Sequence, residues 1–377
     1  MIRKKLVFLT GTRADFGKMK SLMRATQDSD EYEVHIFVTG MHMNSVYGST
    51  VNEVKKEFSN IFEFINHDSI ENMDRTLART IDGFSHYLGQ IKPDLIILHG
   101  DRVETLAGAI VGSLNNILVA HIEGGEVSGT IDELIRHSVS KMSHIHLVSN
   151  NDAKQRLIQL GECEEAIHIL GSPDKDLMQP EKIHSIEIVK KYYSIEFEDF
   201  AVAMFHPVTT ENSCIAKYAK EFVNSLLQSG DNFIVIYPNN DIGSNEILQE
   251  YKRLENNDRF RIFPSIKFEY FLSFLKHGQY IIGNSSAGIH EAPYFATPTI
   301  NIGTRQNNRF VSESIFNSAY DSDSILSAIK SAKNTVIKPS LDDFGNGDSD
   351  RKFLDILKKE NFWDTGTQKS FQNLNWF

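Results

Sequence analysis

The sequence predicts an α/β fold made of two doubly wound domains with a cleft between them. Three observations predict it: short apolar runs alternate with longer amphipathic segments, this alternation weakens after Gly171-Ser172-Pro173, and it then begins again. Strands that alternate with helices form parallel βαβ units with right-handed crossovers. A length of 377 residues also favours two domains.

The first series of alternating strands and helices lies before Gly171. Its predicted strands cover residues 6–9, 34–38, 94–99, 117–120 and 145–148. Helices are expected from about Ala14 and from about Val103, where amphipathic segments begin. We expect this first domain to span residues 1–175, followed by a hinge over about 174–184.

The second array repeats the pattern. Its predicted strands cover residues 201–205, 233–237, 261–263, 280–283 and 299–302, and the domain is expected to span 176–350. The polar stretch 340–350 is typical of a surface loop. After it, Phe353, Ile356 and Leu357 are spaced for one face of a C-terminal helix.

Composition excludes several classes of function. The chain has 50 acidic and 39 basic residues and a formal net charge of -11, which argues against nucleic acid or an anionic membrane as a partner. Its two cysteines, Cys163 and Cys214, form neither a disulfide framework nor a metal-ligand cluster by their spacing, so we expect no metal and a reducing cytoplasm. The start of the chain lacks the pattern of a signal peptide, and no apolar run is long enough for a membrane span.

The segment 121–137 is the most informative part of the chain. Glu123 directly follows an apolar strand, and Gly124-Gly125 allow a sharp turn. Asp132 precedes a helical run, which it could also cap. In open α/β folds, chemistry takes place at the carboxyl ends of the strands. The alternative is a solvated acidic loop, but so many ionisable groups beside glycines favour a functional site.

Two other turns of the first array carry polar groups. Arg13 follows the first strand and opens a helix, where an anion can bind. The alternative there is an ordinary turn with a surface arginine. Asp101 closes the strand 94–99, and an N-cap of the next helix is the simpler interpretation of that residue alone.

The second array offers groups suited to a nucleotide. His206 ends its first strand as a candidate proton carrier or phosphate ligand, and Asn239 ends the next in what is otherwise a common turn. Ser285 and Ser286 lead from a strand into a helix, where hydroxyls and N–H groups favour a diphosphate over simple N-capping. Glu291 and Arg305 complete this group, although Arg305 alone is also compatible with an exposed turn.

Together these motifs resemble the UDP-N-acetylglucosamine 2-epimerase family. More closely, they resemble its hydrolysing branch, which makes N-acetylmannosamine for sialic acid synthesis in bacteria and in the epimerase half of the bifunctional animal enzyme. The resemblance covers most of the chain from Gly11 to about Arg309. The matching motifs, in order, are GTRADFGK, HGDR, HIEGGEVSGTIDELIRH, HPVTTE, YPNND, GNSSAGIHEAP and GTRQ.

The resemblance implies a glycosyltransferase-B-like fold of two Rossmann-like domains, with the C-terminal segment 351–377 packing back on the first domain. It implies Asp101, Glu123 and Asp132 as the acid/base set. His206, also placed in the catalytic group, and Arg13 would stabilise the diphosphate. Further substrate-binding positions would be Gly17, Arg102, Asn239 on the nucleoside side, Ser285, Ser286, Glu291 on the ribose, and Arg305.

The implied reaction converts UDP-N-acetylglucosamine and water into N-acetylmannosamine and UDP, without a cofactor. The resemblance implies a cytoplasmic homodimer that catalyses the first step of sialic acid synthesis, for capsule polysaccharide. A related hydrolysing epimerase acting on a UDP-2,4-diacetamido-trideoxy sugar for legionaminic acid is the nearest alternative. A glycosyltransferase of the same fold would need an acceptor but not the pair Glu123 and Asp132. A UDP-sugar sensor would bind without turnover.

Overall fold

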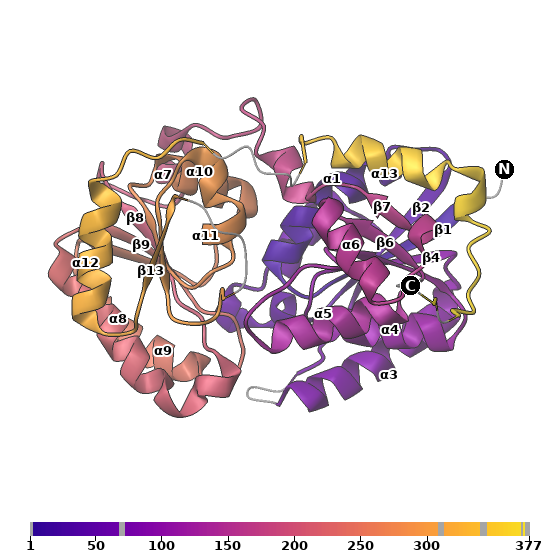
Figure 1. Ribbon diagram of the computed structural model, residues 1–377, viewed down its shortest axis with the longest axis horizontal. Helices are drawn as coiled ribbons and strands as arrows, with labels where there is room; N and C mark the ends of the chain where they lie inside the picture. The colour runs from indigo at the N-terminus through magenta and orange to yellow at the C-terminus, as the bar shows by residue number, and fades with distance from the viewer. Residues whose placement is uncertain (1–2, 68–71, 308–312, 340–344, 371, 374–377) are drawn as a thin grey trace. The chain divides into compact units, whose positions relative to one another are not determined.

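The chain divides into two compact units. The computed structural model describes residues 3–67, 72–307, 313–339, 345–370 and 372–373. Unit 1 comprises Met1–Glu126, Asp132–Gln179 and Asp343–Phe377, and unit 2 comprises Val127–Ile131 and Pro180–Asp342. Figure 1 labels the helices and strands of both. Among the described residues, every helix is too short or too polar to cross a bilayer.

Unit 1 is built on a parallel sheet of seven strands in the order β3-β2-β1-β4-β5-β6-β7. The central strands are buried on both faces, which explains why they are nearly continuous apolar runs in the sequence. The strands are β1 (Lys4–Thr10), β2 (Tyr32–Val38), β3 (Ile61–Glu63), β4 (Leu95–His99), β5 (Leu118–Ile122), β6 (Ile145–Val148) and β7 (Ile167–Ile169).

Helices cover both faces of this sheet. Leu6 and Phe8 point to the face covered by α1 (Arg13–Gln27), α2 (Val51–Glu57) and α13 (Ser349–Leu357). Leu9 and Leu98 point to the opposite face, where α4 (Val103–Leu114) approaches closely through Gly108. Helix α3 (Met73–Ile91) packs on α4, while α5 (Ile131–Met142) and α6 (Asn151–Gln159) follow β5 and β6.

Unit 2 has a six-stranded parallel sheet in the order β10-β9-β8-β11-β12-β13. Its core lies between this sheet and helices α8, α9 and α12. The strands are β8 (Ala201–Met204), β9 (Phe233–Ile236), β10 (Phe260–Phe263), β11 (Ile281–Gly283), β12 (Thr299–Ile302) and β13 (Ile315–Ser318). The helices are α7 (Ile186–Tyr192), α8 (Ile215–Ser229), α9 (Ser244–Tyr251), α10 (Phe268–His277), α11 (Ala287–His290) and α12 (Ser322–Lys333).

The two sheets share one topology. In each, the first strand lies beside the fourth, so the direction in which strands are added reverses between β1 and β4 in unit 1 and between β8 and β11 in unit 2. Ligands of open α/β sheets bind outside the carboxyl ends of the strands at such a reversal. All strands predicted from apolar runs are present, and β3, β7 and β13 are additional strands at the sheet edges.

The segment predicted as a hinge packs differently from the prediction. Residues Pro173–Leu177 form a 3-10 helix whose first four residues are buried. The Asp176 carboxylate accepts hydrogen bonds from the backbone N–H groups of Ser349 (2.8 Å) and Asp350 (3.1 Å), at the start of α13. This part of the chain therefore belongs to unit 1, which continues to Gln179, beyond the predicted boundary at residue 175.

Candidate active site

His121 fixes the turn that carries Asp101. The imidazole is fully buried in β5; its Nε2 donates to the Gly100 carbonyl (2.8 Å), and its Nδ1 accepts from the Ser140 hydroxyl (3.0 Å). Burial lowers the pKa of His121 to about 3, so the ring is neutral. Gly100 has a φ of 76°, which a glycine adopts without strain. His121 lies just beyond the predicted strand 117–120, but in the structure it is a rigid support inside β5.

Glu123 lies between two basic side chains of unit 1. Its Oε1 is 3.1 Å from Lys18 Nζ and 3.3 Å from His99 Nε2. Lys18 Nζ is also 3.8 Å from the fully buried Asp174 carboxylate. Burial opposes the charged form of His99, but the neighbouring Glu123 outweighs it, and the pKa of His99 is raised. Glu123 itself has a φ of 64°, a left-handed conformation that costs a non-glycine residue about 1–2 kcal/mol.

Arg136 joins the remaining carboxylates. Its guanidinium is 2% exposed and forms an ion pair with Asp101, while its Nη1 donates to the Glu126 carbonyl (3.5 Å). Burial lowers the pKa of Arg136, but Asp101, Glu126, Glu123 and Asp132 together raise it.

All three predicted carboxylates of the acid/base set therefore lie near one buried cation. Asp132 is in the first turn of α5, four residues before Arg136, so both face the same side of the helix. The N-cap of α4 is Arg102, without a side-chain cap, and the N-cap interpretation of Asp101 is wrong.

Two glycines shape the turn after Glu123. A Cβ on Gly124 would lie 2.8 Å from Ser140 Oγ and 3.0 Å from His121 Nδ1. Gly125 has a φ of 78°, and its Cβ would lie 2.2 Å from the Ala153 carbonyl oxygen. Neighbouring side chains leave no room for a Cβ at Gly124, and the Ala153 backbone leaves none at Gly125.

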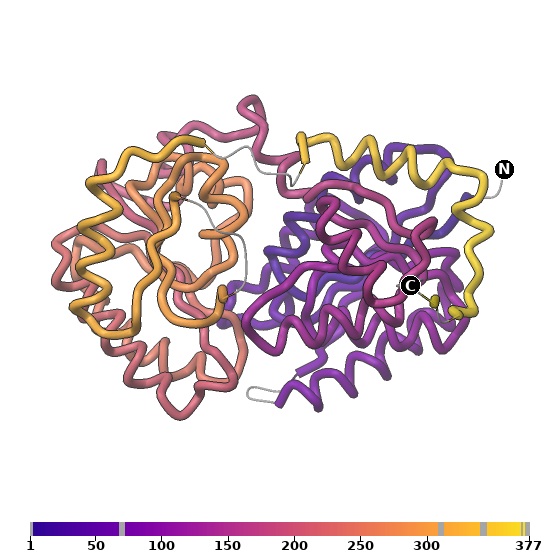
Figure 2. Tube along the Cα trace, viewed as in Figure 1, coloured from indigo at the N-terminus to yellow at the C-terminus, as the bar shows by residue number. Residues whose placement is uncertain are grey.

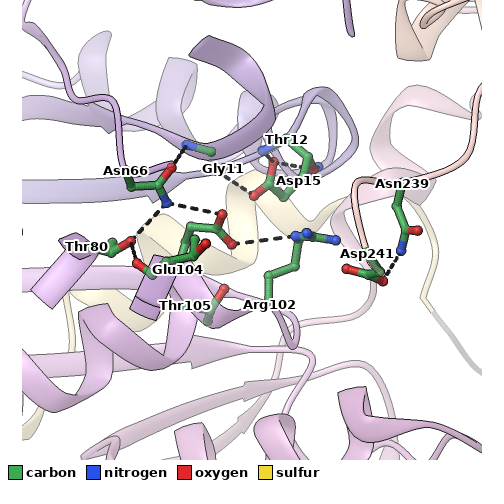
Figure 3. Close-up of polar contacts among 12 residues, drawn as sticks. Gly11, Thr12, Asp15, Asn66, Thr80, Arg102, Glu104, Thr105, Asn239 and Asp241 are labelled. Atoms are coloured by element: carbon green, nitrogen blue, oxygen red, sulfur yellow. Dashed lines mark hydrogen bonds and ion pairs between the residues drawn. The ribbon is translucent and has the colours of Figure 1, made fainter. Parts of the chain in front are cut away.

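A buried network joins the segments after β2 and β3 to helices α3 and α4. Asn66 Nδ2 donates to Thr80 (2.9 Å) and to Glu104 Oε1 (3.3 Å), and Asn66 Oδ1 accepts from the Gly40 N–H (3.2 Å). Arg102 Nε lies 3.5 Å from the other Glu104 oxygen. Figure 3 shows this network beside Gly11, Thr12 and Asp15, where Thr12 and Asp15 form a capping box for α1.

Helix α1 holds two further predicted positions. The Arg13 guanidinium pairs with Glu53, with an Nε–Oε2 distance of 2.8 Å. Gly17 is buried one turn further along α1. A phosphate bound to Arg13 would have to compete with this carboxylate.

In unit 2, the side chain of Asn284 holds the loop that contains His206 through two hydrogen bonds. Its side chain accepts from the His206 N–H (2.7 Å) and donates to the His206 carbonyl (2.8 Å). His206 Nδ1 accepts from the Asn239 N–H (3.0 Å), so the proton of the neutral ring resides on Nε2. The Asn239 amide also donates to Asp241. Asn284 was part of a recognised motif, but its supporting role follows only from the structure.

The backbone carbonyl of Asn284 also binds the loop after β12. It accepts from Arg305 Nη1 (3.2 Å) and Gln306 Nε2 (2.8 Å). Thr304 Oγ1 donates to Glu211 (2.5 Å), which links the same loop to the one after β8. The predicted residues His206, Asn239 and Arg305 are therefore held together within unit 2.

The turn after β11 holds the other predicted residues of unit 2. Ser285 and Ser286 are partly exposed, and the Ser285 hydroxyl accepts from the Ala287 N–H (3.3 Å). The helix expected here is only the single turn α11, because Pro293, in the 3-10 turn Ala292–Phe295, prevents the α-helix from continuing. Glu291 is buried between these two turns.

Comparison with known proteins identifies the family of this chain. A family model described as UDP-N-acetylglucosamine 2-epimerase matches residues 24–358. The chain belongs to the UDP-N-acetylglucosamine 2-epimerase family. A UDP-N-acetylglucosamine 2-epimerase from Neisseria meningitidis serogroup B is 46% identical over 99% of this chain and 100% of that protein.

Two further relatives carry names other than UDP-N-acetylglucosamine 2-epimerase. A UDP-N,N'-diacetylbacillosamine 2-epimerase (hydrolyzing) from Legionella pneumophila is 34% identical, covering 95% of this chain and 96% of the relative. Polysialic acid biosynthesis protein P7 from Escherichia coli is 32% identical, covering 86% and 85%.

A solved epimerase structure shows the same fold. The Methanocaldococcus jannaschii UDP-GlcNAc 2-epimerase, in complex with UDP-GlcNAc and UDP, aligns with a TM-score of 0.80 at 21% identity, covering 94% of this chain and 99% of that one. The fold of this epimerase family member is thus glycosyltransferase-B-like α/β, with two doubly wound Rossmann-like units.

Proposed function

We propose that the chain is a hydrolysing UDP-N-acetylglucosamine 2-epimerase, which converts UDP-N-acetylglucosamine and water into N-acetylmannosamine and UDP. The observation that carries the proposal is the grouping of Asp101, Glu123 and Asp132 around the buried Arg136 at the carboxyl ends of β4 and β5. Epimerisation at C2 with loss of UDP needs more than one proton transfer, and this set supplies several carboxyl groups in one place.

The proposed reaction has two halves. The C2 proton is not acidic, because no carbonyl is attached to C2. Cleavage of the C1–O bond gives C1 oxocarbenium character, and loss of the C2 proton to an enzyme carboxylate then leaves 2-acetamidoglucal and UDP. Water next adds its oxygen to C1, and a proton returns to C2 on the opposite face, which inverts C2. In this scheme Asp101, Glu123 and Asp132 serve as acids and bases, and Arg136 holds Asp101 in place.

We assign binding of the UDP part mainly to unit 2. His206 would donate from Nε2 to the diphosphate, with Arg305, Ser285 and Ser286 as further donors. This assignment is supported by the fixed Nδ1 acceptor of His206. Glu291 would accept from the ribose hydroxyls. The remaining assigned positions are Asn239 near the nucleoside, and Arg13, Gly17 and Arg102 of unit 1 near the phosphates.

The names of the relatives support the hydrolysing branch. The Legionella protein is called hydrolyzing, and the E. coli protein is named for polysialic acid biosynthesis. We therefore propose that the enzyme acts at the first step of sialic acid synthesis, for a capsule polysaccharide. We propose separately that it is a cytoplasmic homodimer that needs no cofactor.

Incubation with UDP-N-acetylglucosamine as the sole sugar substrate in D2O tests the proposal. We expect equimolar UDP and N-acetylmannosamine by NMR, with deuterium at C2 of the product. Accumulation of UDP-N-acetylmannosamine without free UDP would identify the non-hydrolysing reaction. Binding without turnover would indicate a sensor, and turnover only with an added acceptor would indicate a glycosyltransferase.

A second substrate is worth testing because the Legionella relative is named for a diacetamido sugar. The alternative function is hydrolysis and epimerisation of a UDP-2,4-diacetamido-trideoxy-glucose for the legionaminic acid route. Measuring kcat/KM for both nucleotide sugars under the same conditions decides between them. We expect the value for UDP-N-acetylglucosamine to be the larger.

A further inference from the structure

Helix α5 connects the candidate active site to the C-terminal segment. Its first turn carries Asp132, and one turn later Arg136 holds Asp101. A helix of 12 residues is about 18 Å long, so its other end lies well away from the carboxylates. The last carbonyl groups of a helix have no partner within the helix and need donors from elsewhere.

Lys369 supplies those donors. Its Nζ donates to three carbonyls at the end of α5, those of Ser140 (3.3 Å), Lys141 (2.8 Å) and Ser143 (2.6 Å). A positive charge at this end also interacts favourably with the helix dipole. A single residue of the C-terminal segment thus caps the helix that carries Asp132.

A buried anion holds Lys369 in place. Lys369 forms an ion pair with Glu162, whose side chain is 1% exposed. Glu162 also accepts from Lys141 Nζ (3.0 Å) and His146 Nε2 (2.9 Å). Burial raises the pKa of Glu162, but hydrogen bonds and charges from His146 and Lys369 lower it to about 2, so this anion stays charged.

The same segment also contacts the strand that leads to Glu123. His144 Nε2 donates to the Thr367 carbonyl (3.0 Å), and His144 Nδ1 accepts from the Val119 N–H in β5 (3.0 Å). The segment is therefore joined, through His144, to β5 as well as directly to α5.

The segment is anchored at its start as well. Trp363 stacks on Tyr32, and its Nε1 donates to the Leu357 carbonyl at the end of α13 (2.8 Å). Lys4 Nζ lies 5.1 Å from the centre of the Trp363 ring. Figure 2 shows this yellow segment leaving α13 and running along unit 1.

We propose that Lys369 is a positioning residue for the proposed reaction: by holding the C-terminal end of α5, it sets the position of Asp132 and Arg136 at the other end. The inference rests on the proposed function. Because a helix packed in a core moves as a rigid body, a small shift at one end is transmitted to the other. A misplacement of about 1 Å can reduce turnover by up to about 100-fold.

The test compares Lys369→Met, which keeps the aliphatic stem but removes all donors, with Lys369→Arg, which keeps charge and donors. Lys358→Met is the matched control, because Lys358 is an exposed lysine just after α13 and the charge change is identical. Each variant is assayed at a temperature where circular dichroism shows it fully folded. Lys369→Gln, which keeps an amide donor, serves if Lys369→Met does not fold.

We expect Lys369→Met to lower kcat by about tenfold while KM for UDP-N-acetylglucosamine changes less than about twofold, and Lys369→Arg to restore most of kcat. Lys369→Gln should fall between them. Hydrogen exchange should increase in a peptide covering 131–137 but not in α4. A folded Lys369→Met or Lys369→Gln enzyme with the kcat of the wild type would overturn the proposal. If the wild type does not turn over UDP-N-acetylglucosamine, the proposed function is wrong. Unchanged hydrogen exchange in residues 131–137 of Lys369→Met would separately refute the link between Lys369 and the first turn of α5.

Discussion

Arg136 is the residue on which the carboxylate set depends. A buried guanidinium is stable only where anions and carbonyl oxygens surround it, and here Asp101 and the Glu126 carbonyl do so. The same arrangement confines Asp101 to one position. The local sequence around Arg136 is also that of a surface arginine on an amphipathic helix. Its partner Asp101 is 35 residues away in sequence, so the ion pair has no local signal.

Replacing Arg136 separates its charge from its geometry. Arg136→Met leaves Asp101 without its cation, so we expect turnover to fall by about 10²–10³-fold. The free energy of unfolding should fall by about 2–4 kcal/mol, since one member of a mostly buried pair is lost. Arg136→Lys retains the charge and should lose less of both. Steady-state kinetics and urea unfolding measure the two effects, and equal losses in both variants would contradict the role of charge.

Glu123 and Asp132 are expected to act in proton transfer rather than in binding. Glu123→Gln and Asp132→Asn keep the shape of each side chain but remove its proton-accepting form. We expect UDP binding by calorimetry to remain largely intact while kcat falls by about 10²–10⁴-fold. Near-normal turnover in both variants would reject the proposed acid/base set.

At this scale, sequence predicts chemistry better than it predicts contacts. Glu123 is predictable because it directly follows an apolar strand and stands beside two glycines, which is a local signal. Its neighbours Lys18 and His99 come from other elements, and only the sheet order brings them together. Asn284 is similar, because an asparagine that binds the backbone of His206 has no local signature.

At the scale of elements, burial explains why the central strands can be predicted, although the edge strand β10 is mostly not buried and is still predicted from its apolar residues. Central strands such as β4 are buried at every position and appear as apolar runs. The edge strands β3, β7 and β13 have three or four residues and are mostly not buried, so their sequences show no such run. Their pairing is supplied by the neighbouring strand rather than by their own composition.

The turn between β5 and α5 gives a prediction at this scale. Gly125→Ala would force a positive φ on alanine and press its Cβ against the Ala153 carbonyl in α6. We expect a loss of about 2–5 kcal/mol in the free energy of unfolding.

Gly89→Ala is the control for this prediction. Gly89 lies in helix α3, where an added Cβ meets no atom within 4 Å. That change should stabilise by about 0.5–1 kcal/mol, because alanine favours the helix. Urea unfolding of both variants checks the pair, and a tolerated Gly125→Ala would show that this turn can relax.

At the scale of the whole molecule, one strand order is used twice, and each sheet carries polar groups where that order reverses. Unit 1 carries carboxylates there, and unit 2 carries His206 and the serines of the turn after β11. The repeat was predictable because the alternation of strands and helices restarts in the sequence. The boundary of the unit was less predictable. Polar residues such as Asp174 and Asp176 indicate a linker when only the sequence is considered, but the structure buries both.

Charge inside unit 1 also links stability to pH, and the buried His99 is one of the groups involved. Burial lowers its pKa, but Glu123 raises it more, so the net shift is upward. A histidine with a raised folded pKa contributes stability that is present below its unfolded value and lost as the pH rises through the folded value. Below about pH 6.5, His99 is protonated in both states, so it does not offset acid destabilisation.

Acid should destabilise the molecule through its neutral buried histidines. Burial lowers the pKa of His42 to about 4, whereas the unfolded chain has a value of about 6.5, so between these values only the unfolded state binds the proton. The stability that His42 contributes is therefore complete above about pH 6.5 and is lost as the pH falls, by about 2 kcal/mol at pH 5 for this one group.

We expect His42→Gln to reduce the loss of unfolding free energy between pH 7.5 and pH 5 by that amount, and the exposed His86→Gln to leave that loss unchanged. Urea unfolding followed by tryptophan fluorescence measures this in unit 1, because Trp363 packs there on Tyr32 and the segments of unit 2 contain no tryptophan. The same pH dependence in His42→Gln as in the wild type would show that other groups carry the acid sensitivity.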